Sequence, residues 1–115
     1  MIEGMLIKNK EAKQIKFKDS LSEIYKLIDC EYVEMPCRRI KHKMMTVICD
    51  EEGLFKSMPV KSAICDDANE IMVGNLLIAG LSDEDGNLTS LTAAEMKAVA
   101  DAMDRNGILH YSVRS

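Results

Sequence analysis

Residues 71–79, Ile-Met-Val-Gly-Asn-Leu-Leu-Ile-Ala, form the most apolar stretch of the chain. A run of this length and composition is typical of a strand that is buried on both faces of a sheet. Gly74 within it indicates a bulge or a close approach of a neighbouring backbone. The stretch therefore predicts a central strand, around which the other elements must be arranged.

Other segments on both sides of this stretch have strand patterns. Residues 14–18 alternate between polar and apolar side chains, and residues 44–49 are a continuous apolar run. Pro36 predicts that the strand before it ends there or lies at a sheet edge. Acidic turns that contain Gly53 and Gly86 predict hairpins. The predicted strands are 5–7, 14–18, 32–35, 44–49, 54–58, 71–79, 88–91 and 108–113.

Helix start signals occur at two places. Ser20 with Glu23, and Thr92 with Glu95, have the spacing of a capping box, and apolar residues follow each pair at helical spacing. We predict helices over about 20–29 and 93–105, the second stopping at Asn106-Gly107 with a left-handed cap. Residues 60–68 are compatible with a short third helix. This order predicts a single α+β domain over residues 1–115, with a mostly antiparallel sheet.

Length and composition exclude several classes of protein. The chain has 115 residues, enough for one domain with its own core, and 47% hydrophobic content argues against disorder. The net charge of −4 counts against a nucleic-acid-binding protein that relies on overall charge. The sequence has no apolar run long enough to span a membrane and no apolar signal-peptide core at its start. We therefore expect a cytoplasmic protein that does not contact membranes.

Four cysteines are present, at Cys30, Cys37, Cys49 and Cys65. In a reducing cytoplasm they are expected to stay as free thiols. Zinc sites favour pairs of ligands two to four residues apart, and these cysteines are spaced more widely. The spacing predicts no metal site and no cofactor, and thiols that pack as small apolar side chains.

The charge is unevenly distributed along the chain. Residues 1–61 carry twelve Lys/Arg and ten Asp/Glu, whereas residues 62–115 carry three and nine. One basic cluster stands out as the candidate site for an anionic ligand, such as a nucleotide signal, or for an acidic protein surface. The alternative is an exposed loop that only adds solubility. The residues of this basic cluster are Arg38, Arg39, Lys41, His42 and Lys43.

Nine methionines, with no tryptophan, are a second unusual feature. Methionine is flexible, so it fills irregular cores and also forms adaptable contact surfaces. Where methionines lie on an exposed sheet face, they would form a site for self-association or for a partner. Packing in the core is the alternative for each of them. The methionines in or beside predicted strands are Met35, Met44, Met45, Met58 and Met72.

Four segments carry a resemblance to a known family. They are residues 20–34 (Ser-Leu-Ser-Glu-Ile-Tyr-Lys-Leu-Ile-Asp-Cys-Glu-Tyr-Val-Glu), 47–54 (Val-Ile-Cys-Asp-Glu-Glu-Gly-Leu), 73–78 (Val-Gly-Asn-Leu-Leu-Ile) and 90–92 (Ser-Leu-Thr). Over about residues 15–95 the chain resembles a domain-of-unknown-function family of small phage, plasmid and conjugative-element proteins. The chain departs from the family where small residues, usually glycine, stand at the positions of Asp29 and Cys30.

The resemblance brings no catalytic motif, but it implies a setting in mobile genetic elements. We therefore expect a non-enzymatic accessory protein that inhibits a host defence component by stoichiometric protein binding, with a homo-oligomer as one form it can take. One alternative is a protein that sequesters a nucleotide-type immune signal through the basic cluster. The other is a small enzyme that pairs a cysteine with His42 or His110.

Overall fold

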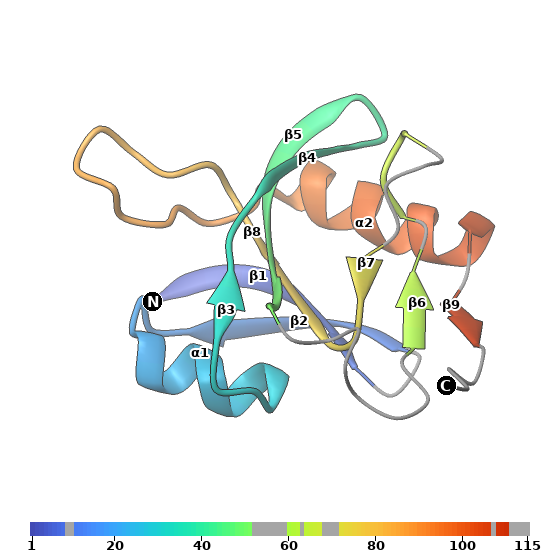
Figure 1. The fold of residues 1–115 in the computed structure, drawn as a ribbon. Coiled ribbons are helices and arrows are strands. Elements are labelled where there is room, and N and C mark those ends of the chain that lie inside the picture. Colours follow the sequence, from blue (N-terminus) through green and yellow to red (C-terminus); the bar gives the residue numbers. More distant parts are fainter. Residues whose placement is uncertain (9–10, 52–59, 63, 68–71, 107, 111–115) are drawn as a thin grey trace.

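The computed structural model describes residues 1–8, 11–51, 60–62, 64–67, 72–106 and 108–110 (Figure 1). The apolar stretch forms two strands, β7 (Met72–Val73) and β8 (Leu76–Ala79), and all four residues of β8 are buried. Between them Gly74 adopts a φ of 82°, with no atom within 4 Å of where a Cβ would lie. Gly74 is therefore required for its left-handed backbone, and the prediction of a bulge or close approach there is wrong.

The main sheet has six strands, and β8 lies inside it. Every pairing between these strands is antiparallel, which confirms the α+β class. A second, three-stranded sheet has the order β7, β6 and β9. In the main sheet the strands run in the order β2 (Glu11–Phe17), β1 (Ile2–Lys8), β8, β5 (Lys43–Asp50) and β3 (Val33–Glu34). The sixth strand, β4 (Cys37–Ile40), also pairs with β5. In the second sheet β6 is Val60–Ser62 and β9 is Ile108–His110.

Two helices, α1 (Leu21–Ile28) and α2 (Ala93–Asn106), cover opposite faces of the main sheet (Figure 1). Alternate residues of β8 enter separate cores. Leu76 and Ile78 join the core that contains side chains of α2, whereas Leu77 and Ala79 join the core that contains side chains of α1. Because both faces are covered, the strand is apolar at every position.

Close backbone packing occurs in β1, at Gly4. A Cβ on this residue would lie 2.5 Å from the carbonyl oxygen of Ile78 and 3.1 Å from Cε1 of Phe17. Real Cβ atoms do not approach backbone oxygens this closely, so only glycine fits between β2 and β8. The sequence suggested a close backbone approach at Gly74, in the predicted central strand. The structure has it at Gly4, in the neighbouring strand β1.

Pro36 interrupts the hydrogen bonding at the edge of the sheet, but it does not change the strand register. β3 and β4 pair with β5 in one continuous register, so they act as a single edge strand. The amide of Val47 donates to the carbonyl of Pro36 (2.9 Å), but proline has no N–H with which to return the bond. The prediction that Pro36 ends a strand or lies at a sheet edge is confirmed, because Pro36 follows β3 and lies in the edge strand of the main sheet.

The two predicted capping boxes have different outcomes. At α2 the box is complete, because Glu95 N donates to Thr92 Oγ1 (3.1 Å) and Thr92 N donates to Glu95 Oε1 (2.9 Å). At α1 the predicted box is wrong. Ser20 makes no side-chain cap bond, and its hydroxyl instead bonds the hydroxyl of Ser22 (3.0 Å).

At its C-terminal end α1 stops at Asp29, which adopts a left-handed φ of 55°. Glycine adopts this conformation at no steric cost, and aspartate is among the few other residues that tolerate it.

Two predicted elements differ from the structure. Within the described part of residues 60–68 there is no helix: β6 is a strand, and residues 64–67 are irregular, because Asp66 is bonded to a hairpin described below. Residues 88–91 are not a strand: their segment makes single backbone bonds, Gly80 N to Thr89 O and Leu91 N to Glu3 O (each 2.8 Å), and no strand ladder. The predicted segment 54–58, the end of the last strand and the cap at Gly107 lie outside the described residues.

The contrast between the two helix starts gives a matched test. We expect Thr92→Ala to lower the free energy of unfolding by about 1 kcal/mol, because it removes an acceptor for a helix N–H. Ser20→Ala is the control, and we expect it to change stability by only a few tenths of that value. Urea unfolding followed by circular dichroism measures both. Equal losses would contradict the assignment of the caps.

Candidate functional site

The basic cluster does not form the loop that the sequence predicts; it forms the β4–β5 hairpin. Arg38 and Arg39 lie in β4, and Lys43 begins β5. Lys41 and His42 form the two-residue turn, with φ values of 47° and 69°. Two consecutive positive φ angles are the signature of a type I′ turn, which usually contains Asn and Gly. Lysine and histidine adopt this conformation at a cost, so other contacts must hold the turn.

Asp66 supplies those contacts. Its carboxylate accepts hydrogen bonds from the amides of both turn residues, Lys41 N to Oδ1 and His42 N to Oδ2, each at 2.7 Å. The amide of Asp66 donates in return to the carbonyl of Arg39 (2.8 Å). Three backbone groups of the hairpin are thereby satisfied by one residue. We call this arrangement the Asp66 clamp.

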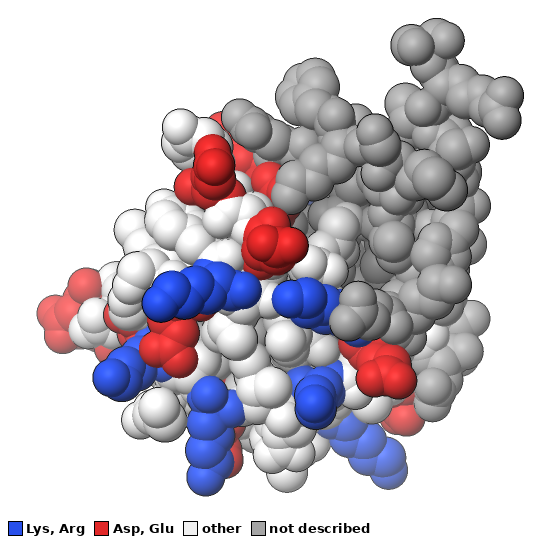
Figure 2. Space-filling model, turned by 90° about the horizontal axis from the view of Figure 1, so that it is seen from below, with Lys and Arg blue, Asp and Glu red and all other residues white. Residues whose placement is uncertain are grey.

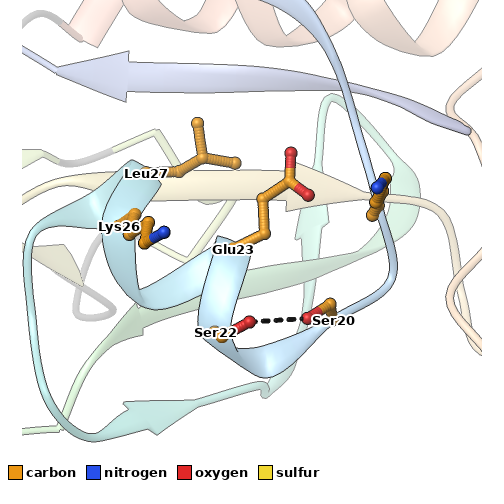
Figure 3. A pocket seen from close by; sticks show the side chains of 6 residues that line it. Ser20, Ser22, Glu23, Lys26 and Leu27 are labelled. Carbon is orange, nitrogen blue, oxygen red and sulfur yellow. Dashed lines mark hydrogen bonds between the residues drawn. The ribbon is translucent and has the colours of Figure 1, made fainter.

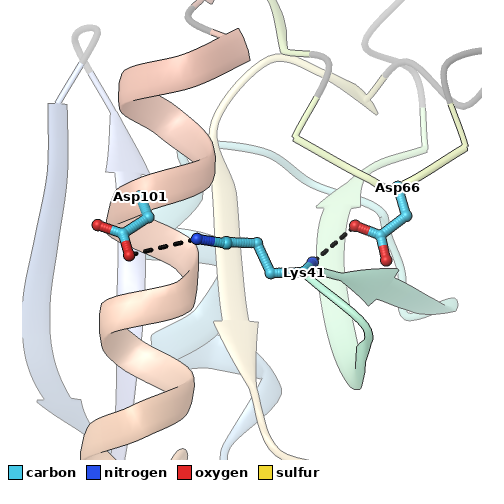
Figure 4. A network of polar contacts seen from close by, with 3 residues as sticks. All are labelled: Lys41, Asp66 and Asp101. Carbon is cyan, nitrogen blue, oxygen red and sulfur yellow. Dashed lines mark hydrogen bonds and ion pairs between the residues drawn. The ribbon is translucent and has the colours of Figure 1, made fainter.

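A second acidic residue holds the side chain of the turn lysine. Lys41 Nζ lies 3.4 Å from Oδ2 of Asp101 in α2, and Figure 4 shows Lys41 between this carboxylate and Asp66. Lys41 is therefore bonded within the molecule at both its backbone and its side chain. It contributes to the position of the hairpin, and it is not available as a free cation for a ligand.

The remaining basic residues differ in exposure. Arg39 and Lys43 are exposed, and the side chain of His42 is 93% exposed, with Nδ1 3.8 Å from Asp66 Oδ2. Arg38 is half-buried and donates from Nη1 to the carbonyl of Cys37 (2.9 Å). The available positive charge thus lies on Arg39 and Lys43, and the imidazole of His42 is exposed at the turn.

Strand alternation separates these cations. Arg39 pairs with Met44, and both face the side of the sheet that α1 covers. Arg38 pairs with Met45, which belongs to the core under α2, and Lys43 shares that side. The predicted cluster is therefore contiguous in sequence but divided between two faces, with His42 at the tip.

Methionine also reaches the surface beside the hairpin. Met35, between β3 and β4, is 38% exposed, and Met44, in β5, is 39% exposed. Cys37, in β4, is exposed as well. We call these three residues the methionine strip. They surround Thr46, which pairs with Cys37 and is only 2% exposed. The interpretation of methionines as an exposed sheet face holds for Met35 and Met44; Met58 lies outside the described residues, and Met5, Met45, Met72 and Met103 are buried.

A shallow pocket that sequence reasoning missed lies between the end of β2 and the start of α1 (Figure 3). Its volume is about 510 Å³. Two lysines and two serine hydroxyls can donate to an anion there, whereas one glutamate opposes it. The pocket has no contiguous sequence signature, because its residues come from the end of a strand and from one face of a helix. It is lined by Lys18, Ser20, Ser22, Glu23, Lys26 and Leu27.

The surface around this pocket carries both signs of charge. Figure 2 views the molecule from the side of α1, and blue Lys and Arg atoms alternate with red Asp and Glu atoms over the described part of that face. Lys16, on β2, lies 3.9 Å from Glu3. The positive balance of the N-terminal half therefore does not produce a continuous basic face on this side of the molecule.

The four cysteines are free, and they differ in burial. Cys49 and Cys65 are buried as expected, whereas Cys30 is half-buried and the expectation of burial is wrong for Cys37, which is exposed. Burial raises the pKa of the Cys49 thiol to about 11, and the negative charge of Glu34 adds to this effect. A neutral thiol is a poor nucleophile.

The buried thiol of Cys49 does not lie beside His42. Cys49 lies toward the opposite end of β5 from the hairpin turn that holds His42. Among the described residues, no group of three His, Cys, Asp or Glu side chains is placed to hold a metal ion.

The Asp66 clamp can be tested by removing the carboxylate. We expect Asp66→Ala to lower the free energy of unfolding by about 1–3 kcal/mol, because two amides lose their acceptors in a turn that non-glycine residues strain. Hydrogen exchange at Lys41 and His42 should become faster. Glu84→Ala, at an exposed position, is the control. Unchanged exchange at the turn would contradict the clamp.

The Cys49 pKa predicts a pH dependence. Above pH 9 the unfolded chain ionises this thiol while the folded chain keeps its proton, so the unfolding free energy should fall as the pH rises from about 9 to 11. We expect Cys49→Ala to have a shallower pH slope than the wild type in chemical unfolding over this interval. Cys37→Ala, which removes an exposed thiol, should keep the wild-type slope.

Comparison with known proteins places the chain in a family. Searches of curated proteins and of solved structures found no significant match. No helix in the described residues is both long and apolar enough to cross a membrane. The sequence model of one family, described as "Domain of unknown function (DUF3846)", matches residues 2–104, a range that includes α1, the strands of the main sheet and α2 as far as residue 104. The chain therefore belongs to this domain-of-unknown-function family.

Proposed function

We propose that this protein is a non-enzymatic accessory protein of a phage or other mobile genetic element, acting in the cytoplasm of the host cell. It inhibits a host defence component by stoichiometric binding to a protein surface. The mobile-element setting comes from the sequence resemblance, and the mode of action comes from the surface around the β4–β5 hairpin.

The observation that carries this proposal is the fixed position of the hairpin. The Asp66 clamp and the contact between Lys41 and Asp101 tie the turn to two other parts of the fold. A hairpin held in this way loses little conformational entropy when a partner binds it, which favours affinity. It presents the exposed His42 and Lys43 to the partner.

The partner surface is expected to be acidic. Lys43 supplies positive charge next to the exposed His42 at the tip of the hairpin. Charge complementarity raises the association rate and excludes wrongly charged partners. An acidic partner surface fits this tip.

Affinity capture from host lysate tests the proposal. We expect the wild-type chain to recover a defence protein, and the variant with His42→Asn and Lys43→Gln to lose at least tenfold in affinity for it. Asparagine at 42 keeps a residue that tolerates the left-handed turn. Lys13→Gln with Lys16→Gln, at two exposed positions of β2, is the matched control.

Titration of the recovered defence activity separates binding from catalysis. Inhibition should rise in proportion to the added protein and become complete near one equivalent. Full inhibition by a small fraction of an equivalent would overturn the stoichiometric mechanism. A folded chain that recovers no specific partner would overturn the proposal as a whole.

A second candidate function is supported by the pocket at α1. Its size accommodates a small organic anion, and Lys18, Lys26 and the hydroxyls of Ser20 and Ser22 supply donors for phosphate. This candidate is a protein that sequesters a nucleotide-type immune signal. It places the ligand at the pocket instead of the basic cluster.

Calorimetry with a panel of cyclic nucleotides and nucleotide-sugar signals tests this second function. Binding heat that disappears in Lys18→Gln with Lys26→Gln, and persists in Arg38→Ala with Arg39→Ala, would assign the signal to the pocket. The reverse pattern would assign it to the hairpin. Absence of heat across the panel would overturn sequestration.

A further inference from the structure

The methionine strip lies on one sheet face beside a short, buried polar side chain. Cys37 pairs with Thr46, and Arg39 pairs with Met44 in the adjacent row. On the other side of β5, Thr46 pairs with Ala79 at the end of β8. Adjacent strands are about 4.8 Å apart, so the exposed side chains of Cys37, Arg39 and Met44 form a small surface on β4 and β5, next to the buried Thr46 and Ala79.

Thr46 makes this surface unusual. Its Oγ1 is buried and has no hydrogen-bond partner among the described residues; Ala79 beside it is also buried, whereas Met44 and Cys37 are exposed. A buried hydroxyl without a partner is costly, and strand positions facing solvent usually carry polar side chains. Methionine at two exposed positions around such a group favours an interface over a solvated face.

Opposite charges flank the strip on its two sides. Arg39 lies on the edge strand. On the other side, the chain leaves the end of β8 as a projecting arm. The tip of this arm carries the exposed residues Asp83, Glu84 and Asp85. The arm is ordered by Asp83, whose carboxylate accepts from Asp85 N (2.9 Å) and Asn87 N (3.0 Å). Figure 1 shows the arm and the hairpin leaving the same end of the sheet in opposite directions.

The arm belongs to the same face as the strip. Leu88, near its base, is buried in the core that contains the side chains of α1. The amide of Leu88 also donates to Oδ2 of Asp19, which precedes α1 (3.0 Å). One sheet face therefore carries, in order, a basic side, an apolar centre and an acidic side.

This order is complementary to itself. If two copies meet through this face about a two-fold axis parallel to β5, the basic side of each copy lies over the acidic side of the other. An axis perpendicular to β5 would instead place Arg39 against Arg39. Two-fold interfaces require such self-complementary surfaces.

We propose that the methionine strip is the centre of a two-fold dimer interface, occupied by a second copy of this chain. Met35 and Met44 of the two copies pack against each other, and Arg39 of each copy pairs with the acidic arm of the other. Because the axis runs along β5, the two hairpin turns lie at the same end of the dimer. If the proposed function holds, the dimer presents two copies of His42 and Lys43 to its target; the interface itself does not depend on that function.

Sedimentation equilibrium of the purified chain tests the dimer. We expect the wild type to dimerise with micromolar affinity at low salt, and the dissociation constant to rise severalfold between 50 and 500 mM salt as the ion pairs are screened. Met44→Glu should weaken dimerisation at least tenfold. Leu21→Glu is the matched control, because Leu21 is 53% exposed on α1 and lies outside the strip.

Charge reversal tests the orientation of the two copies. Arg39→Glu should weaken the dimer, and combining it with Glu84→Lys should restore most of the lost affinity, since the exchanged charges meet across the axis. Glu84 is suitable because the ordered arm depends on the carboxylate of Asp83. If Met44→Glu does not fold by circular dichroism, Met35→Lys replaces it.

A wild type that stays monomeric at 200 μM would overturn the proposal. A dimer whose affinity is unchanged by Met44→Glu, Met35→Lys and Arg39→Glu would also overturn it, because its interface would lie elsewhere. Both readouts use this chain alone, so they are independent of whether a host partner is found.

Discussion

Burial of β8 on both faces is the constraint on which the rest of the fold depends. A strand of four apolar residues cannot leave either side to water, so a helix is needed on each face. The chain meets this need with α1 on one side and α2 on the other, and it brings β1 and β5 to the two edges of β8. Gly4 allows β1 to approach, because any larger side chain would meet the backbone of Ile78.

The hairpin beside this core shows how a strained turn is kept in one conformation. Lys41 and His42 have backbone angles that these residue types disfavour, and a carboxylate from a distant segment accepts both of their amides. Asp66 occupies the place that an external anion would otherwise take. The basic cluster is consequently less suited to a small anion than its sequence suggests, and better suited to a larger surface that contacts the outward-pointing side chains.

Sequence patterns predicted the fold class, the central strand and both helices, because these depend on apolar periodicity within short windows. They predicted one capping box correctly at Thr92 and one incorrectly at Ser20, where a neighbouring hydroxyl competes for the same oxygen. The proposed helix over 60–68 failed because Asp66 is bonded to residues 25 positions away. The division of the basic cluster between two faces follows from strand pairing, which the sequence Arg-Arg-Ile-Lys-His-Lys does not indicate on its own.

The edge strand containing Pro36 has a consequence for the behaviour of the protein at high concentration. Open sheet edges can recruit further strands and start fibres. Here the outward carbonyl of Arg39 already accepts a bond from Asp66, that of Cys37 accepts one from Arg38, and a proline interrupts the ladder. The opposite edge, β2, carries exposed lysines. At high concentration the chain can therefore associate through the methionine strip without forming fibres through its sheet edges.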